Sequence, residues 1–269
     1  MVKQFALKQS AFPNVIIFCL QRTIKGKFMK LNNTHTKTVN GRNGFHSNGH
    51  SPKIINGFNN LGDDHVATSI ETPLRPDAFK MSDREKMSLI EDHFREIMEI
   101  IGLDLNDDSL RGTPHRVSKM FIKEIFYGLN PENKPKISVF ENKFKYGEML
   151  VEKNINLNSF CEHHFLPIVG KAHVAYISSG EVIGLSKINR IVDYFARRPQ
   201  VQERLTVQIA SELKRALKTD DVAVLIDAKH MCVSCRGIQD DSSTTVTAEY
   251  SGKFREKASR EEFLKYIKL

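Results

Sequence analysis

The sequence predicts an α+β fold, in which a disordered tail is followed by helices and then by a largely antiparallel β-sheet. Two observations carry this prediction. Apolar residues recur at helical spacing through residues 82–125, and from about residue 149 the pattern changes to β-branched and alternating segments. The resulting order is helices, two strands, two helices, two strands and a helix. Because strands and helices do not alternate one by one, this order favours an antiparallel sheet over a doubly wound parallel one.

Residues 1–80 are predicted to form a disordered, basic and polar N-terminal tail. They contain 11 Lys and Arg residues against 4 Asp and Glu, and residues 31–61 are mostly Asn, Gly, His, Ser and Thr. So little apolar surface cannot offset the entropy lost on ordering. The short apolar run Val15–Leu20 leaves three interpretations of the start of the chain open: a solvated tail, a targeting segment, or residues ahead of a true start at Met29 or Met81.

Composition excludes several classes of protein. The 269 residues are 40% hydrophobic and 27% charged, which is ordinary for a globular chain. Four cysteines are too few for a disulfide scaffold, and no apolar run approaches the roughly 18 residues of a membrane span. The net charge of +8 lies almost wholly in the tail, because residues 81–269 carry 29 basic and 28 acidic residues. We therefore expect a folded body that binds neither nucleic acid nor membrane.

Helices are predicted first, over residues 81–148. Ser82–Glu85 is a capping-box pattern, and apolar residues follow it at helical spacing. Thr113–Pro114 starts a second helix with Pro at its first position, and Gly128 is expected to end it. Residues 134–145 are expected to form a loop.

The sheet is predicted to lie within residues 149–269. Alternating and β-branched residues indicate the strands, and a Ser–Glu cap indicates the last helix. Pro199 stands between two helical patterns, so we expect it to end the first helix and open the second. The expected strands are Met149–Leu157, Lys171–Ile177, Val222–Ala228 and Thr245–Phe254, and the expected helices are Ser186–Arg198, a helix opened by Pro199, and Ser259–Ile267.

Two short clusters contain three of the four cysteines. The first is Cys161–His164 and the second is His230–Arg236, and each stands at the end of a predicted strand. Thiolate and imidazole are ligands that Zn²⁺ prefers, and Cys-x-x-His spacing lets one turn present both to a single ion. Two such clusters in one chain predict a metal site.

The spacing suggests which side chains bind the ion. Neighbouring residues point in different directions, so Cys161 and His164 form the natural ligand pair and His163 is not expected to bind the metal. If the second strand continues, His230 and Cys232 share one of its faces. Cys161, His164 and Cys232 would then bind the metal and leave a fourth position for water, as catalytic zinc sites do. The two remaining histidines would be available for proton transfer near neutral pH.

The same spacing also allows a closed structural site. Cys232-x-x-Cys235 is a zinc-knuckle spacing. Together with Cys161 and His164, this pair would complete a Cys₃His site with no catalytic role. For His163, considered by itself, an ordinary hydrogen-bonded core histidine is as good an interpretation as a catalytic one.

Basic residues at helical spacing are candidate anion ligands. Arg116 and Lys119 lie three residues apart on one predicted helix, Lys187 and Arg190 lie three apart on another, and Arg236 follows the second metal cluster. A solvated helix face explains each pair equally well. Sequence spacing does not establish that these groups converge.

A further candidate is the pair Gln202–Glu203, early in the helix that follows Pro199. An amide beside a carboxylate can bind the donor edge of a nucleobase. Glu203 can equally be an ordinary exposed helix residue.

Several segments together resemble GTP cyclohydrolase I, and the resemblance covers about residues 82–269. The segments are Cys161-Glu162-His163-His164-Phe165, Gly184-Leu185-Ser186-Lys187-Ile188-Asn189-Arg190-Ile191-Val192, Arg198-Pro199-Gln200-Val201-Gln202-Glu203-Arg204-Leu205-Thr206, His230-Met231-Cys232 with Arg236-Gly237, and Thr113-Pro114-His115-Arg116-Val117.

The resemblance implies the tunnelling fold, an antiparallel sheet backed by two helices, which assembles as a toroidal homodecamer with active sites between subunits. It implies residues 81–269 as the catalytic domain, with N-terminal helices over 81–148 and the tunnelling-fold part over 149–269. The implied reaction is zinc-dependent: GTP is hydrolysed and rearranged to 7,8-dihydroneopterin triphosphate with release of formate, the first step of folate and pterin biosynthesis.

The resemblance also implies the roles of the metal ligands and catalytic groups. Cys161, His164 and Cys232 would bind Zn²⁺, which acidifies the attacking water. His230 would protonate a nitrogen of the imidazole ring of GTP, and His163 would assist beside it as acid, base and substrate contact.

Eight residues are implied in substrate binding. They are Gln202 and Glu203 for guanine, Ser186 near the ribose, Lys187, Arg190 and Arg236 for the triphosphate, and Arg116 and Lys119 for the triphosphate from a neighbouring subunit.

Two other functions remain as alternatives. A related tunnelling-fold enzyme, such as a deazaguanine nitrile reductase, would use a cysteine nucleophile and NADPH rather than paired metal clusters. A structural-zinc module with a nucleic-acid-binding tail would need the closed site. Free thiolate ligands favour a cytoplasmic location, while a regulatory partner, feedback regulation and the role of Cys235 are not predicted.

Overall fold

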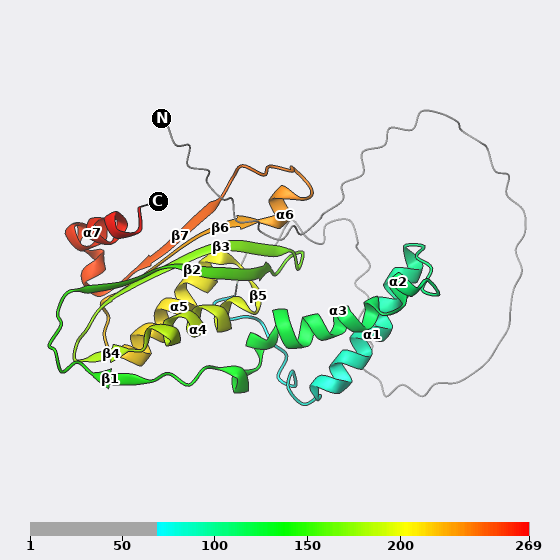
Figure 1. The fold of residues 1–269 in the computed structure, drawn as a ribbon, viewed down its shortest axis with the longest axis horizontal. Helices are drawn as coiled ribbons and strands as arrows, with labels where there is room; N and C mark the ends of the chain where they lie inside the picture. The colour runs from blue at the N-terminus through cyan, green and yellow to red at the C-terminus, as the bar shows by residue number, and fades with distance from the viewer. Residues whose placement is uncertain (1–68, 269) are drawn as a thin grey trace, which may run out of the picture. The chain divides into compact units, whose positions relative to one another are not determined.

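The computed structural model describes residues 69–268 (Figure 1). Residues 1–68 of the tail predicted for residues 1–80 therefore lie outside the described residues. Within them, helices come first and a sheet with flanking helices follows, so the α+β prediction is confirmed. No helix in this described range is both long enough and apolar enough to cross a bilayer.

A five-stranded sheet carries the fold, with the order β5-β2-β3-β6-β7. Neighbouring strands from β2 to β7 run antiparallel, and only the short edge strand β5 runs parallel to its neighbour β2. The strands are β2 (Met149–Cys161), β3 (Pro167–Ile177), β5 (Pro199–Gln200), β6 (Val222–His230) and β7 (Thr245–Tyr250).

Two helices cover one face of this sheet, as the resemblance implied: α4 (Leu185–Ala196) and α5 (Gln202–Leu217) (Figure 1). Their apolar stripes pack with strand side chains in one buried cluster that includes Leu157, Ile209 and Ile226. Each such side chain contributes about 1.5–3 kcal/mol on burial. The cluster therefore fixes both helices against the strands that end at the metal-ligand candidates.

Within residues 69–268, the cover on the other face lies at one end of the sheet. A 3₁₀ turn, η4 (Gly252–Arg255), and helix α7 (Lys257–Ile267) bring Phe254 and Phe263 against Leu225 of β6. Alternate residues of β6 thus enter the two opposite clusters, which explains why this strand is apolar at nearly every position.

The N-terminal helices form as predicted from their start signals. Helix α1 (Asp83–Ile100) has the full capping box at Ser82, and α3 (Thr113–Met120) has Pro in its first turn. The chain between them forms the short helix α2 (Asp108–Arg111), and α3 continues into a π-helical turn, η1 (Phe121–Ile125).

Gly128 joins this helical region to α4 rather than ending a helix. It lies in the 3₁₀ turn η2 (Tyr127–Leu129), which a second turn, η3 (Pro131–Asn133), follows. Its N–H donates to the carbonyl of Arg197 at 3.0 Å. A Cβ at this position would lie 2.1 Å from the carbonyl oxygen of Tyr194, so the contact requires glycine.

Three segments differ from the prediction. The expected loop at 134–145 contains strand β1 (Val139–Glu141), which pairs with β4 (Glu181–Ile183) in a separate two-stranded sheet. Pro199 is in edge strand β5, where its missing N–H costs no ladder bond, and the helix begins after it. Helix α7 starts before the expected cap Ser259, which lies inside the helix.

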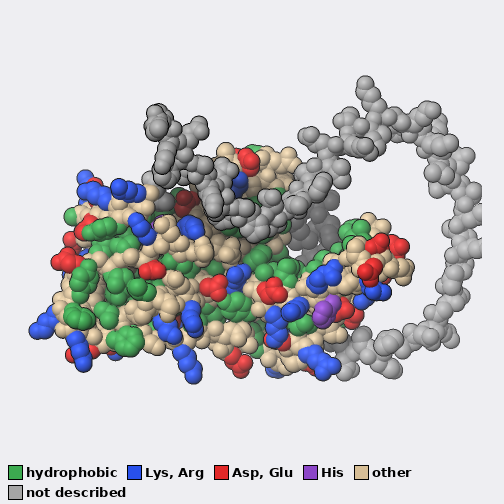
Figure 2. Space-filling model, in the orientation of Figure 1, with side chains coloured by type: hydrophobic (Ala, Val, Ile, Leu, Met, Phe, Trp, Pro, Cys, Tyr) green, Lys and Arg blue, Asp and Glu red, His purple; other side chains and the backbone are tan. Residues whose placement is uncertain are grey.

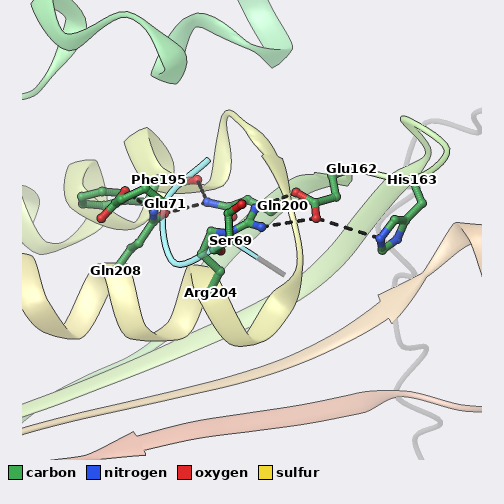
Figure 3. Close-up of polar contacts among 8 residues, drawn as sticks. All are labelled: Ser69, Glu71, Glu162, His163, Phe195, Gln200, Arg204 and Gln208. Atoms are coloured by element: carbon green, nitrogen blue, oxygen red, sulfur yellow. Dashed lines mark hydrogen bonds and ion pairs between the residues drawn. The ribbon is translucent and has the colours of Figure 1, made fainter. Parts of the chain in front are cut away.

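Residues 69–80, the leading segment, were assigned to the tail but are held by hydrogen bonds. The segment has no helix or strand. The Arg204 guanidinium of α5 donates through Nε to the carbonyl of Ser69 at 2.8 Å, and Gln208 donates to the Glu71 carboxylate at 2.7 Å (Figure 3). Arg204 also forms a two-pronged ion pair with Glu162, with N–O distances of 2.6 and 3.2 Å.

Arg204→Ala is expected to lower the free energy of unfolding by about 3 kcal/mol, because it leaves the carboxylate of Glu162 without its buried partner. Arg215→Ala is the matched control on the same helix. Its side chain is 66% exposed and pairs with Glu212, so we expect a loss of no more than about 1 kcal/mol. Urea unfolding followed by circular dichroism measures both, and equal losses would contradict the assigned importance of the Arg204 pair.

Candidate active site

The first ligand cluster lies in the turn between β2 and β3. Cys161 is the last residue of β2, and its N–H donates to the carbonyl of Leu166 across the turn at 2.9 Å. The backbone N–H of His164 donates to the Cys161 sulfur at 3.3 Å, and the imidazole Nδ1 of His164 lies 3.6 Å from that sulfur. The turn therefore presents a thiol and an imidazole side by side.

The second cluster meets the first because of strand register. His230 is the last residue of β6 and pairs with Ile168 near the start of β3. Strand β6 ends at His230, so His230 and Cys232 do not share a strand face, which was one possibility that the sequence allowed. A helical turn, α6 (Met231–Ser234), begins instead. This turn brings the sulfur of Cys232 to the Cys161–His164 pair, and the three ligand atoms lie within 4.8 Å of one another.

The donor set fits a zinc ion. Two sulfurs and one imidazole nitrogen are typical zinc ligands and are close enough to share one ion. Burial, and secondly the neighbouring Cys161 thiol, raise the pKa of the Cys232 thiol, and a bound cation would offset both effects. Cys235 is outside this group: it is exposed, and its thiol donates to the carbonyl of Met231 at 2.8 Å. The arrangement has three protein ligands and favours the open site.

A cavity of about 570 Å³ is lined by two of the three candidate ligands, Cys161 and Cys232. Two residues of the leading segment, Ser69 and Ile70, form part of its wall. It is lined by six of the residues singled out in the sequence: Cys161, His163, Gln202, Glu203, His230 and Cys232.

His230 is held at the cavity wall by Gln202. The imidazole Nε2 lies 2.8 Å from the amide oxygen of Gln202. Burial lowers the pKa of the His230 imidazole, and the nearby Glu203 carboxylate acts in the opposite direction. In its neutral form the ring is a proton acceptor with one free nitrogen.

His163 lies on the same turn as the metal-ligand pair, on the side of the ion pair. Its Nε2 is 3.9 Å from the carboxylate of Glu162, which Arg204 holds from the opposite side (Figure 3). The side chain of Arg204 is only 3% exposed. Glu162 and Arg204 stand within the sequence motifs, but no role was predicted for either residue. The sequence feature that could have indicated this ion pair is Arg204, a charged residue beside the apolar stripe of α5.

Not all the candidate anion ligands reach this cavity within one chain. Arg236 does come close, because its guanidinium contacts Nε2 of His164 at 2.7 Å. Arg116 instead donates to the hydroxyl of Thr113 at 2.8 Å and to the carbonyl of Ser109 at 3.2 Å, and Lys119 is exposed on the same helix.

Ser186, Lys187 and Arg190 lie in the N-terminal half of α4, which follows β4, whereas the end of α4 leads to β5 beside Cys161. The helix has 12 residues and is therefore about 18 Å long. These three side chains are thus toward the far end of the helix from the cavity, and none of them lines it.

Comparison with known proteins shows which family the chain belongs to. The profile of the family described as GTP cyclohydrolase I matches residues 90–268. The GTP cyclohydrolase 1 of Flavobacterium johnsoniae is 61% identical over 209 residues, which are 78% of this chain and 94% of that protein. Those of Citrobacter koseri and Salmonella arizonae are each 53% identical over 204 residues, 76% of this chain and 92% of each relative.

The family profile covers the helical region from α1 onward, the whole sheet and both ligand clusters. Matches of this length and identity show that the chain belongs to the GTP cyclohydrolase I family.

Proposed function

We propose that this protein is a zinc-dependent GTP cyclohydrolase that converts GTP to 7,8-dihydroneopterin triphosphate and formate, the first step of folate and pterin biosynthesis. One observation carries the proposal: Cys161, His164 and Cys232 form a three-ligand group that opens on a cavity lined by two further histidines. Zinc, when bound there, supplies the Lewis-acid chemistry that makes a water molecule nucleophilic at neutral pH. The reaction needs proton transfers beside that water, which histidines provide.

The two histidines divide the proton transfers. His230, with its pKa lowered by burial, takes up a proton and delivers it to a nitrogen of the purine's five-membered ring. His163 acts beside it as acid, base and substrate contact. Glu203 is exposed and lines the cavity, so its carboxylate is available to accept hydrogen bonds from the N–H groups of guanine. Arg236 lies beside His164 and is available to the triphosphate.

A second copy of the chain would complete the site. Ser186, Lys187 and Arg190 are needed for the ribose and triphosphate but do not line the cavity of their own chain. Ile97, Ile100 and Ile101 lie together at the end of α1 and are 50%, 83% and 68% exposed. Exposed apolar side chains that lie together favour a protein–protein contact. We therefore infer a homo-oligomer, with the family's toroidal decamer as the expected form and Arg116 and Lys119 reaching a neighbour's site.

The described part of the chain, on the face that Figure 2 shows, gives no support to nucleic-acid binding. On the face of the described residues shown in Figure 2, Lys and Arg side chains are interspersed with acidic and apolar ones. A nucleic-acid groove would need a continuous basic stripe. We infer a cytoplasmic location because the proposed ligands are thiolates that must remain reduced.

The full-length protein, with bound zinc quantified, is expected to release formate from GTP while pterin absorbance and fluorescence grow. A chelator should abolish both signals, because water activation depends on the metal. Zinc at one ion per chain without any formate release would contradict the proposed activity and favour a structural site.

Cys161→Ala is expected to lose both the zinc and formate release, because it removes one of three ligands. Cys235→Ser is the matched control and should keep both, since that thiol faces the carbonyl of Met231 and not the ligand group. Metal analysis of the purified variants gives a readout independent of turnover. Loss of zinc in the Cys235 variant would support the closed four-ligand site instead.

His230→Ala is expected to keep its zinc and to lose turnover by about 10²–10⁴-fold, the usual contribution of general acid–base catalysis.

Lys187→Ala should lose turnover through weak triphosphate binding, and mixing it with His230→Ala tests whether two copies of the chain share a site. If the site combines two copies, oligomers assembled from equal amounts of both variants contain about a quarter intact sites and regain that share of activity. No recovery on mixing, with mixed oligomers verified by tag pull-down, would contradict a shared site.

A further inference from the structure

Gln202 is enclosed by protein contacts on both sides of its amide. Its residue is 1% exposed. The amide nitrogen donates to the carbonyls of Ile226 and Thr245 at 3.2 and 2.8 Å and to the hydroxyl of Thr247 at 3.1 Å. The amide oxygen accepts from the His230 ring at 2.8 Å. No polar atom of this side chain is left without a protein partner.

These partners fix which end of the amide faces His230. Two of the three groups around the nitrogen are backbone carbonyls, which only accept hydrogen bonds, so the donating NH₂ must face them. The oxygen must then face the imidazole. An amide oxygen only accepts, so Nε2 of His230 carries a hydrogen, and Nδ1 is the ring nitrogen outside this contact.

The backbone of Gln202 is held as firmly as its side chain. Its carbonyl accepts from the hydroxyl of Thr206 at 2.8 Å, and that hydroxyl lies 2.7 Å from the hydroxyl of Thr247. Thr247 of β7 thus contacts the amide nitrogen of Gln202. It also contacts Thr206, which lies on the first turns of α5 with Gln202. The amide is therefore anchored to β6, β7 and α5 at once, which makes it a rigid support for a ring.

We propose that Gln202 is a positioning residue that acts on the reaction through His230, holding the imidazole in one orientation with Nε2–H toward the amide and Nδ1 toward the reacting atoms. This inference rests on the proposed function of His230 as the proton donor. The amide nitrogen already has three protein acceptors, so it would have to give one up before it could donate to a nucleobase. The amide oxygen has a second lone pair, so positioning His230 adds to, and does not replace, a contact with guanine.

The chemistry explains why glutamine suits this position. Glutamate would bring a carboxylate against two carbonyl oxygens, which cannot donate to it. Asparagine is one methylene shorter and cannot span from the strand carbonyls to the ring. Methionine matches the length of glutamine but cannot donate to the strand acceptors as the amide nitrogen does, nor replace the amide oxygen that accepts from His230.

The test is Gln202→Met in the full-length, zinc-loaded protein. We expect kcat to fall by about tenfold or more, as expected when a proton-transfer group loses its orientation, while KM for GTP and zinc content stay near wild type. Gln208→Met is the matched control: this glutamine is on the same helix and is 5% exposed, but its partners are Gln200 and Glu71 and not His230. It should lower kcat much less than Gln202→Met does, because it makes no contact with the His230 ring.

A double-mutant comparison separates positioning from a structural effect. In the His230→Ala background, Gln202→Met should change kcat little further, because the group it positions is gone. Gln202→Asn provides a milder variant if the methionine variant does not fold, with the same expectation. A raised KM with unchanged kcat, or a full additional loss in the His230→Ala background, would overturn the inference while leaving the proposed activity intact. Absence of formate release by the wild-type protein would overturn both.

Discussion

The ion pair between Arg204 and Glu162 is the constraint on which the rest of the site depends. The Arg204 side chain is 3% exposed, so its N–H donors need protein acceptors. Arg204 therefore connects its own helix with two other segments, which supply those acceptors. Glu162 belongs to the turn that carries two of the proposed zinc ligands, Arg204 belongs to α5, and Ser69 belongs to the leading segment. One planar group thus sets the position of the ligand turn, the helix that bears Gln202 and a wall of the cavity.

Strand register supplies the second constraint. The turn after β2 and the end of β6 meet because both flank the same end of β3, where Ile168 pairs with His230. The antiparallel ladder therefore brings together residues that are about seventy positions apart in the sequence. Helix α5 starts at that same end, since β5 leads the chain there beside Cys161, and this places Gln202 and Glu203 at the cavity.

Much of the fold was predictable because its signals are local. The capping box at Ser82, the β-branched run of β6 and the stripes of α4 and α5 each lie within one element. The grouping of the proposed metal ligands was predictable for a similar reason, since two short sequence spacings contain all three residues. Strand β1 and edge strand β5 were not predictable, because each pairs with a strand that is distant in the sequence. The same limit applied to Gln202, whose donors are directed at carbonyls of strands that follow it in the chain.

The leading segment is fastened in two ways that differ in their tolerance of mutation. At Ser69 the acceptor is the main-chain carbonyl, which every amino acid supplies, so substitutions there leave that contact available. At Glu71 the acceptor is the side-chain carboxylate bound by Gln208, and a change of residue removes it. We therefore expect the two positions to differ in how freely their residues change during evolution. The contact at Ser69 tolerates almost any replacement, whereas the contact at Glu71 needs an acidic or amide side chain.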